Sequence, residues 1–119
     1  AVNQAGKSIR DAKILLIGLA YKRDIDDLRE SPALAILDRL YRHGADLRYY
    51  DPYVPKYHFA GETLTSVALT PELLAMTDGV VIVTDHSCLD KEMLVAHAPL
   101  IIDTRNALKG IPSPKIVRL

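Results

Sequence analysis

The segment from Lys13 to Pro32 constrains the fold more than any other part of the chain. It opens with the apolar run 14–17, which is too short for a helix face and ends at Gly18. Such a run is typical of a strand buried on both faces of a parallel sheet. The segment closes with Ser31-Pro32, where the hydroxyl can cap free backbone N–H groups and proline suits the first helical position. Ligands of parallel α/β sheets bind at the loops after the strands, so the long charged connection predicts a binding site.

A helix and a second strand follow this segment. The helix is predicted from apolar residues at positions i, i+3, i+4 and i+7, and Gly44 is placed to end it in the left-handed conformation. Residues 46–50 then read as a strand whose polar alternation indicates a position near the sheet edge. Strand, helix and strand together predict a right-handed βαβ unit. The apolar positions of the helix are Ala33, Ile36, Leu37 and Leu40.

The rest of the chain continues the alternation of strands and helices. Residues 51–61 hold two prolines and three aromatic residues without a period, which predicts a loop with Tyr53, Tyr57 and Phe59 partly buried. Thr70-Pro71 predicts a helix start, and the pattern indicates helices over 71–76 and 89–96, strands over 80–84 and 100–103, and a possible fifth strand at 115–117. The predicted fold is α/β: a three-layer, doubly wound, Rossmann-like and mostly parallel sheet of about five strands.

Length and charge limit the functions open to the chain. Its 119 residues suffice for one domain, which we place at 13–119, with 1–12 read as the tail of an upstream linker or helix. Fifteen basic and fifteen acidic side chains cancel, so no overall field attracts nucleic acid or an anionic membrane. The single cysteine, Cys88, excludes an internal disulfide, and no apolar run approaches the roughly 20 residues of a membrane span. We therefore predict a cytoplasmic protein with neither nucleic acid nor membrane as partner.

One interpretation of the first loop is a self-contained dinucleotide-binding Rossmann module. That fingerprint needs three glycines for close approach to a pyrophosphate, but only Gly18 is present, and Ala20 and Arg23 occupy the later positions. Asp51 could act as the ribose-binding acid, and it is equally an ordinary turn start. This interpretation is disfavoured and remains an alternative, as does a non-catalytic protein-interaction domain.

A group of cations is the better candidate for a site. Lys22 and Arg29 in the first loop, with Arg105 after the fourth predicted strand, would suit a diphosphate if they converge on one sheet edge. Tyr21 could offer a ring face to a base or sugar. The alternative is that Lys22 and Arg29 only pair with neighbouring carboxylates on a solvated loop.

Other combinations of reactive side chains do not form a recognisable site. Asp26-Asp27 lacks a third metal ligand at a known spacing, and the histidines show no zinc pattern. The residues of Asp85-His86-Ser87 are adjacent and lack a nucleophile elbow, so they do not indicate a hydrolase triad. Nothing indicates a stabilised thiolate at Cys88.

Four segments in order carry a family resemblance: GLAYKRDIDDLRESPAL, GADLRYYDPYVP, VVIVTDHSCLD and IIDTRNALKG. Together they resemble the C-terminal UDP-binding domain of the UDP-glucose/GDP-mannose dehydrogenase family. The details look closer to the UDP-N-acetylhexosamine 6-dehydrogenases than to the UDP-glucose or GDP-mannose enzymes.

The resemblance implies one part of an NAD-dependent oxidoreductase of polysaccharide biosynthesis. Members oxidise the C6 alcohol of a UDP-sugar to a carboxylate, giving a UDP-uronic acid. NAD is held mainly by an N-terminal domain, and a central helical segment dimerises, so the implied partners are those domains and the UDP-sugar, in a homo-oligomeric parent. The family's catalytic cysteine lies upstream in a motif that this chain lacks. No catalytic residue is therefore expected here, and the isolated chain is expected to be inactive.

The resemblance also assigns roles by position. Tyr21 and Lys22 match the aromatic–lysine pair that contacts the nucleotide sugar. Arg105 matches a substrate-contacting arginine. Arg29 matches the arginine that reaches toward NAD held by the other domain.

Overall fold

The computed structural model describes residues 11–19, 32–59, 61–84, 86, 89–105 and 107–118. In these ranges, strands and helices alternate in the order that the sequence predicts, with one addition after the second strand. The elements are β1 (Lys13–Ile17), α1 (Pro32–Arg42), β2 (Asp46–Tyr50), β3 (Lys56–Phe59), β4 (Glu62–Thr65), α2 (Pro71–Met76), β5 (Gly79–Ile82), α3 (Lys91–His97), β6 (Ile101–Asp103) and β7 (Ile116–Arg118).

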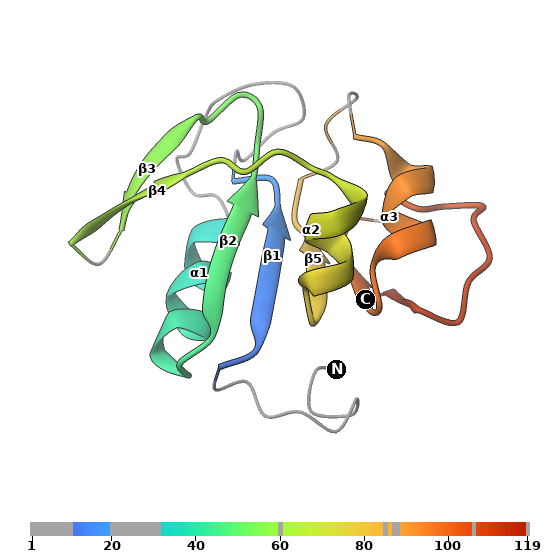
Figure 1. The fold of residues 1–119 in the computed structure, drawn as a ribbon, viewed down its shortest axis with the longest axis horizontal. Coiled ribbons are helices and arrows are strands. Elements are labelled where there is room, and N and C mark those ends of the chain that lie inside the picture. Colours follow the sequence, from blue (N-terminus) through green and yellow to red (C-terminus); the bar gives the residue numbers. More distant parts are fainter. Residues whose placement is uncertain are drawn as a thin grey trace.

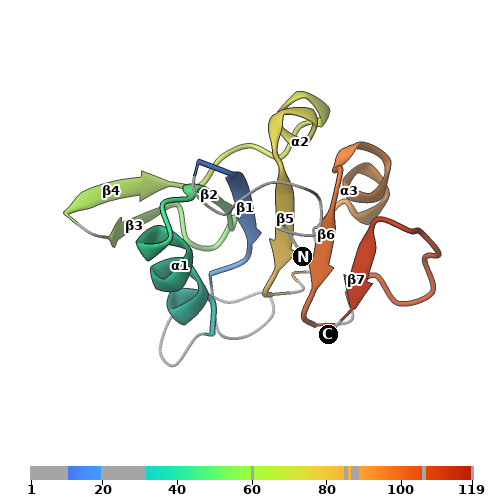
Figure 2. The ribbon, with the colours of Figure 1, turned by 90° about the horizontal axis from the view of Figure 1, so that it is seen from below.

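The main sheet has five strands in the order β2-β1-β5-β6-β7; β2, β1 and β5 are labelled in Figure 1, and Figure 2 labels β6 and β7 as well. Each neighbouring pair is parallel, which confirms the predicted sheet, the fifth strand and the edge position of β2. The strands β1 and β5 lie inside the sheet and are buried along nearly their whole length. Their continuous apolar runs are what a strand covered on both faces requires.

Helices cover both faces of the sheet, with α1 on one side and α2 and α3 on the other (Figure 2). Successive residues of β1 point to opposite faces. Leu16 therefore packs in the cluster that contains Leu37 of α1, while Leu15 packs in the cluster with Leu74 of α2 and Leu94 of α3. The three predicted layers are confirmed, and β1 contributes to both cores.

Local signals in the sequence fix the ends of the helices. The Thr70 hydroxyl accepts a hydrogen bond of 3.1 Å from Leu73 N, and Asp90 caps α3 by accepting one of 3.1 Å from Met93 N. Gly44 follows α1 with a φ of 84°, as its predicted role requires. In the part of the chain that the structure describes, no helix is long and apolar enough to cross a membrane.

The prediction of a loop over 51–61 is wrong for its second half. The strands β3 and β4 form an antiparallel hairpin that projects beyond β2 (Figure 1). The hairpin is short and largely exposed, so it has no buried apolar run to mark it in the sequence. Tyr57 is partly buried against the α1-side core, as predicted, whereas Tyr53 is 39% exposed and the side chain of Phe59 lies outside the described atoms.

Candidate functional site at the carboxyl edge of the sheet

The carboxyl ends of β1 and β5 form the switch point of the sheet, because the chain leaves β1 toward β2 on one side and returns to β5 on the other. Gly18 lies at this point with a φ of 92°. Its amide donates to Tyr50 O at 2.8 Å, and a Cβ atom placed on it would lie 2.3 Å from Cβ of Thr84. Only glycine permits both this conformation and this close approach of the two central segments.

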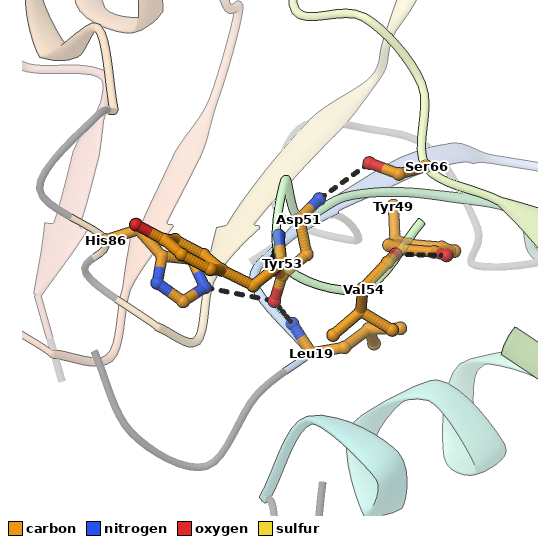
Figure 3. Close-up of polar contacts among 7 residues, drawn as sticks. All are labelled: Leu19, Tyr49, Asp51, Tyr53, Val54, Ser66 and His86. Carbon is orange, nitrogen blue, oxygen red and sulfur yellow. Dashed lines mark hydrogen bonds and ion pairs between the residues drawn. The ribbon is translucent and has the colours of Figure 1, made fainter. Parts of the chain in front are cut away.

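The Asp51 carboxylate, directly after β2, joins three segments at this edge (Figure 3). Its Oδ2 atom accepts from Leu19 N at 2.8 Å and contacts Nε2 of His86 at 3.0 Å, and its Oδ1 atom accepts from Tyr53 N at 2.9 Å. The Asp51 amide donates to the Ser66 hydroxyl at 2.8 Å.

Burial makes this arrangement costly to disturb. The exposed fractions of Asp51 and His86 are 0% and 1%. A carboxylate removed from water is stable only when its oxygens accept strong hydrogen bonds, and here two backbone amides and an imidazole supply them. Because a carboxylate oxygen accepts, the His86 Nε2 atom carries the shared proton. The Tyr53 ring lies over the imidazole, with the ring centroids 4.9 Å apart.

Tyr49 supports the same turn from within the α1-side core. Its hydroxyl donates to Val54 O at 2.7 Å, and its side chain is fully buried. Burial, and secondarily the negative charge of Asp51, raise the pKa of Tyr49 above its ordinary value of 10.0, while a hydrogen bond with the Ser66 backbone acts in the opposite direction.

A second buried aspartate, Asp103, organises the loop after β6. Its Oδ1 atom accepts from Arg105 N at 3.1 Å and from Ala107 N at 3.0 Å, and its Oδ2 atom accepts from Leu108 N at 2.8 Å. The Thr104 hydroxyl donates to Ile82 O at 2.6 Å, which ties this loop to β5. The Arg105 side chain is exposed on a backbone that is fixed at its own amide.

Of the four predicted site residues, the structure describes one, Arg105. Arg105 follows β6 at the carboxyl edge, where the sequence places it. Tyr21, Lys22 and Arg29 lie outside the described residues, as do Ser31 and Cys88, so the convergence of the three cations remains a prediction. In the described ranges, no group of three or more histidine, cysteine or acidic residues could hold a metal ion.

Sequence reasoning missed the pairing of Asp51 with His86. It treated each residue alone, the aspartate as a ribose ligand or turn start and the histidine as part of a chance triplet. The two residues are 35 positions apart in the chain. A usable signal existed, because each follows a strand predicted to be parallel, and such strands end at the same edge.

The described part of this edge does not fit NAD. Asp51 occupies the position at which a Rossmann domain holds the ribose, but its carboxylate oxygens accept from Leu19 N, Tyr53 N and His86. The aspartate therefore performs the turn-forming role, the second of the two interpretations open from the sequence. No reaction step that involves bound NAD is therefore assigned to these residues.

A separate hollow of about 620 Å³ lies along α1, from Ala35 to His43 just after the helix. It is lined in part by Ile36, Arg39 and His43, and by Asp38 and Arg42, which form an ion pair of 3.0 Å with each other. Its described lining does not include Arg105, the predicted site residue that the structure describes. We therefore place the candidate nucleotide site at the carboxyl edge of the sheet.

Comparison with known proteins identifies the family to which this chain belongs. Residues 15–110 match the model of the UDP-glucose/GDP-mannose dehydrogenase family, UDP binding domain. The chain is 33% identical over 113 residues to UDP-glucose 6-dehydrogenase YwqF of Bacillus subtilis, covering 89% of this chain and 26% of that protein. It is 33% identical over 126 residues to UDP-N-acetyl-D-mannosamine dehydrogenase of Pyrococcus horikoshii, covering 99% and 27%.

Solved structures agree. The structure of UDP-D-ManNAc dehydrogenase from P. horikoshii superimposes with a TM-score of 0.74 at 29% identity, over 98% of this chain and 27% of that one. An NDP-N-acetyl-D-galactosaminuronic acid dehydrogenase from Methanosarcina mazei gives a TM-score of 0.71 at 25% identity, over 99% and 26%. The chain thus spans about a quarter of the length of these relatives, and it belongs to the UDP-glucose/GDP-mannose dehydrogenase family, whose UDP binding domain it matches.

Proposed function

We propose that the chain binds the UDP part of a nucleotide sugar within an NAD-dependent UDP-sugar 6-dehydrogenase. The observation that carries this proposal is the match of residues 15–110 to the UDP binding domain. In the proposed enzyme the sugar C6 alcohol is oxidised to a carboxylate with two molecules of NAD as oxidant, and the catalytic residues lie outside this chain. The isolated chain is accordingly expected to show no dehydrogenase turnover.

Each predicted site residue has a role in the proposal. Lys22 and Arg105 hold the diphosphate, Lys22 as a compact charge and Arg105 as a planar fork, and Tyr21 contacts the nucleotide sugar. Arg29 reaches toward NAD held by another domain. The exposed Arg105 on a loop fixed by Asp103 supports this assignment, because its guanidinium can reach a ligand while its backbone stays in place.

The comparisons include relatives named for UDP-glucose and relatives named for UDP-N-acetyl-D-mannosamine at similar identity. The preference for a UDP-N-acetylhexosamine therefore rests on the sequence motifs. A phosphate-holding domain serves either sugar equally, because UDP is the part that the two substrates share. Binding energy from UDP would orient the sugar toward the distant reacting groups.

Calorimetric titration of the chain with UDP tests the proposal. With only one wall of the cleft present, we expect weak binding, with a Kd on the order of 100 μM. Lys22→Ala and Arg105→Ala should each weaken UDP binding about tenfold, because each removes a charge-assisted contact with the diphosphate. Arg42→Ala removes an exposed cation from α1 and should leave the affinity unchanged.

Two results would overturn the proposal. One is tight binding of NAD without binding of UDP, which would indicate a self-contained dinucleotide module. The other is the absence of any amide shift on addition of UDP, which would favour a protein-interaction domain.

A further inference from the structure

We propose that Asp51 and His86 are positioning residues for nucleotide binding: their buried contact fixes the Leu19 amide, directly before residues 20–31, which include Tyr21 and Lys22. The inference rests on the proposed function, since it concerns the loop that carries Tyr21 and Lys22. Neither Asp51 nor His86 need touch UDP, yet both are expected to affect the affinity of the chain for UDP.

The first step is the position of Leu19. Its amide donates to Asp51 Oδ2 at 2.8 Å, and its side chain is fully buried in the core cluster with Leu37 and Tyr49. Lys22 follows Leu19 by three residues in the sequence. A displacement of the Leu19 backbone therefore moves the point from which the chain continues toward Tyr21 and Lys22.

The second step is the dependence of this anchor on His86. Asp51 Oδ2 contacts both Leu19 N and the imidazole Nε2 atom, and both side chains are almost completely buried. Without the imidazole proton, the carboxylate would be left under-satisfied in an apolar setting and would reorient or admit water. Either response shifts the acceptor away from Leu19.

The third step is how the histidine itself is held. The Tyr53 ring lies over the imidazole, and the Tyr53 amide donates to Oδ1 of the same carboxylate (Figure 3). The His86 carbonyl accepts from Leu89 N at 3.2 Å on the approach to α3. The imidazole is thus held by the Tyr53 ring and the Asp51 carboxylate, and the His86 backbone is held by Leu89, as a positioning group requires.

A pair of amide variants at position 86 tests the inference. The side-chain nitrogen of His86→Gln can reach the place of the imidazole Nε2 atom, whereas that of His86→Asn stops near the place of Nδ1. We expect His86→Gln to bind UDP within about twofold of the wild-type chain and His86→Asn about tenfold more weakly, because small misplacements of contacting groups reduce binding. Tyr49→Phe is the matched control, since it removes the buried hydrogen bond to Val54 O from the same turn and deletes no partner of the hydrogen bonds that join Asp51 to Leu19 and His86.

The unfolding free energy of each variant is measured alongside the UDP affinity. If His86 acts only on stability, UDP affinity will follow the unfolding free energy, and Tyr49→Phe and His86→Asn will bind alike. That result overturns the inference and leaves the proposed function intact. Absence of UDP binding by the wild-type chain overturns both.

A second measurement needs no variant and therefore cannot fail through misfolding. In the wild-type chain, the Leu19 amide resonance should shift on addition of UDP with the same saturation curve as the calorimetric binding. A Leu19 amide that stays unchanged while UDP binds overturns the inference.

Discussion

At the scale of single residues, the carboxyl edge depends on two buried aspartates. Asp51 accepts hydrogen bonds from the amides of Leu19 and Tyr53 and from His86. Asp103 accepts hydrogen bonds from three amides of the turn that follows β6. Both side chains have an exposed fraction of 0%. Each aspartate replaces the hydrogen bonds that the backbone loses where a strand ends.

Asp103→Asn should lower the unfolding free energy by about 2 kcal/mol, because an amide group has one acceptor oxygen where the turn offers three donors. Chemical denaturation of the chain measures this loss. Asp90→Asn is the matched control: Asp90 caps α3 at its exposed end, and asparagine caps helices equally well, so the change should stay below about 0.5 kcal/mol. Equal losses at the two positions would contradict the role given to Asp103.

Tyr49→Phe should change how stability depends on alkaline pH. The folded chain raises the pKa of Tyr49 above 10.0, so it keeps this proton at a pH where the unfolded chain has lost it. The unfolding free energy of the wild-type chain therefore falls as the pH rises above the unfolded pKa, and phenylalanine removes this contribution.

Near neutral pH, Tyr49→Phe should be less stable than the wild-type chain by about 1 kcal/mol through the lost hydrogen bond to Val54. Denaturation series from about pH 9 to about pH 11 should show this gap narrowing. Tyr41→Phe, at an exposed position of α1, serves as the control. A Tyr49→Phe gap that is constant over this range would contradict the assignment.

At the scale of elements, the close approach of the segments that end β1 and β5 shapes the site. The amides of Val83 and Thr84 both donate to Ile17 O, at 2.9 and 3.1 Å, and Gly18 leaves no space for a side chain beside Thr84. This approach brings the segment after β5, which carries His86, next to the exit from β1.

Gly18→Ala should destabilise the chain by about 3 kcal/mol or more, since it adds a steric overlap to an unfavourable backbone conformation. Gly61→Ala separates the two contributions. Gly61 has a similar φ of 80°, but nothing lies within 4 Å of its added Cβ atom, so its cost should be only about 1–2 kcal/mol. Denaturation midpoints that fall equally for the two variants would show that the overlap with Thr84 is relieved by movement.

At the scale of the whole molecule, one sheet contributes to two cores, and the hairpin packs at the margin of the α1-side core. The interior strands β1 and β5 contribute to the clusters on both faces. The described side chains of β3 and β4 that reach the α1-side cluster, Tyr57 and Leu64, are only partly buried. The described structure therefore has a central body and a less firmly packed extension.

Hydrogen exchange should separate these parts. Amides bonded within β1 and β5 should exchange only through global unfolding, with a free energy equal to that from denaturation, because opening either strand disrupts both cores. Amides of the β3–β4 hairpin should exchange through local opening, with a lower free energy and a weak dependence on denaturant. Equal protection of the hairpin and the interior strands would show that they unfold as one unit.

Much of the architecture was predictable because it depends on local patterns. The apolar runs of β1 and β5, the Thr70 cap and the terminating Gly44 each act within a few residues, and the structure confirms them. The β3–β4 hairpin was not predictable in this way, because its exposed strands lack a buried face. The family, likewise, was predictable from four short segments in order, and the comparisons confirm it.

The sequence alone determined the helices and the strands of the main sheet, their order and the family of the chain, since each of these depends on residues close together along the chain. Only the tertiary structure decided that Asp51 meets Leu19 and His86, which lie 32 and 35 positions away from it. Those contacts follow from the strand order β2-β1-β5, because neighbouring parallel strands end at one edge and bring distant loops within hydrogen-bonding distance.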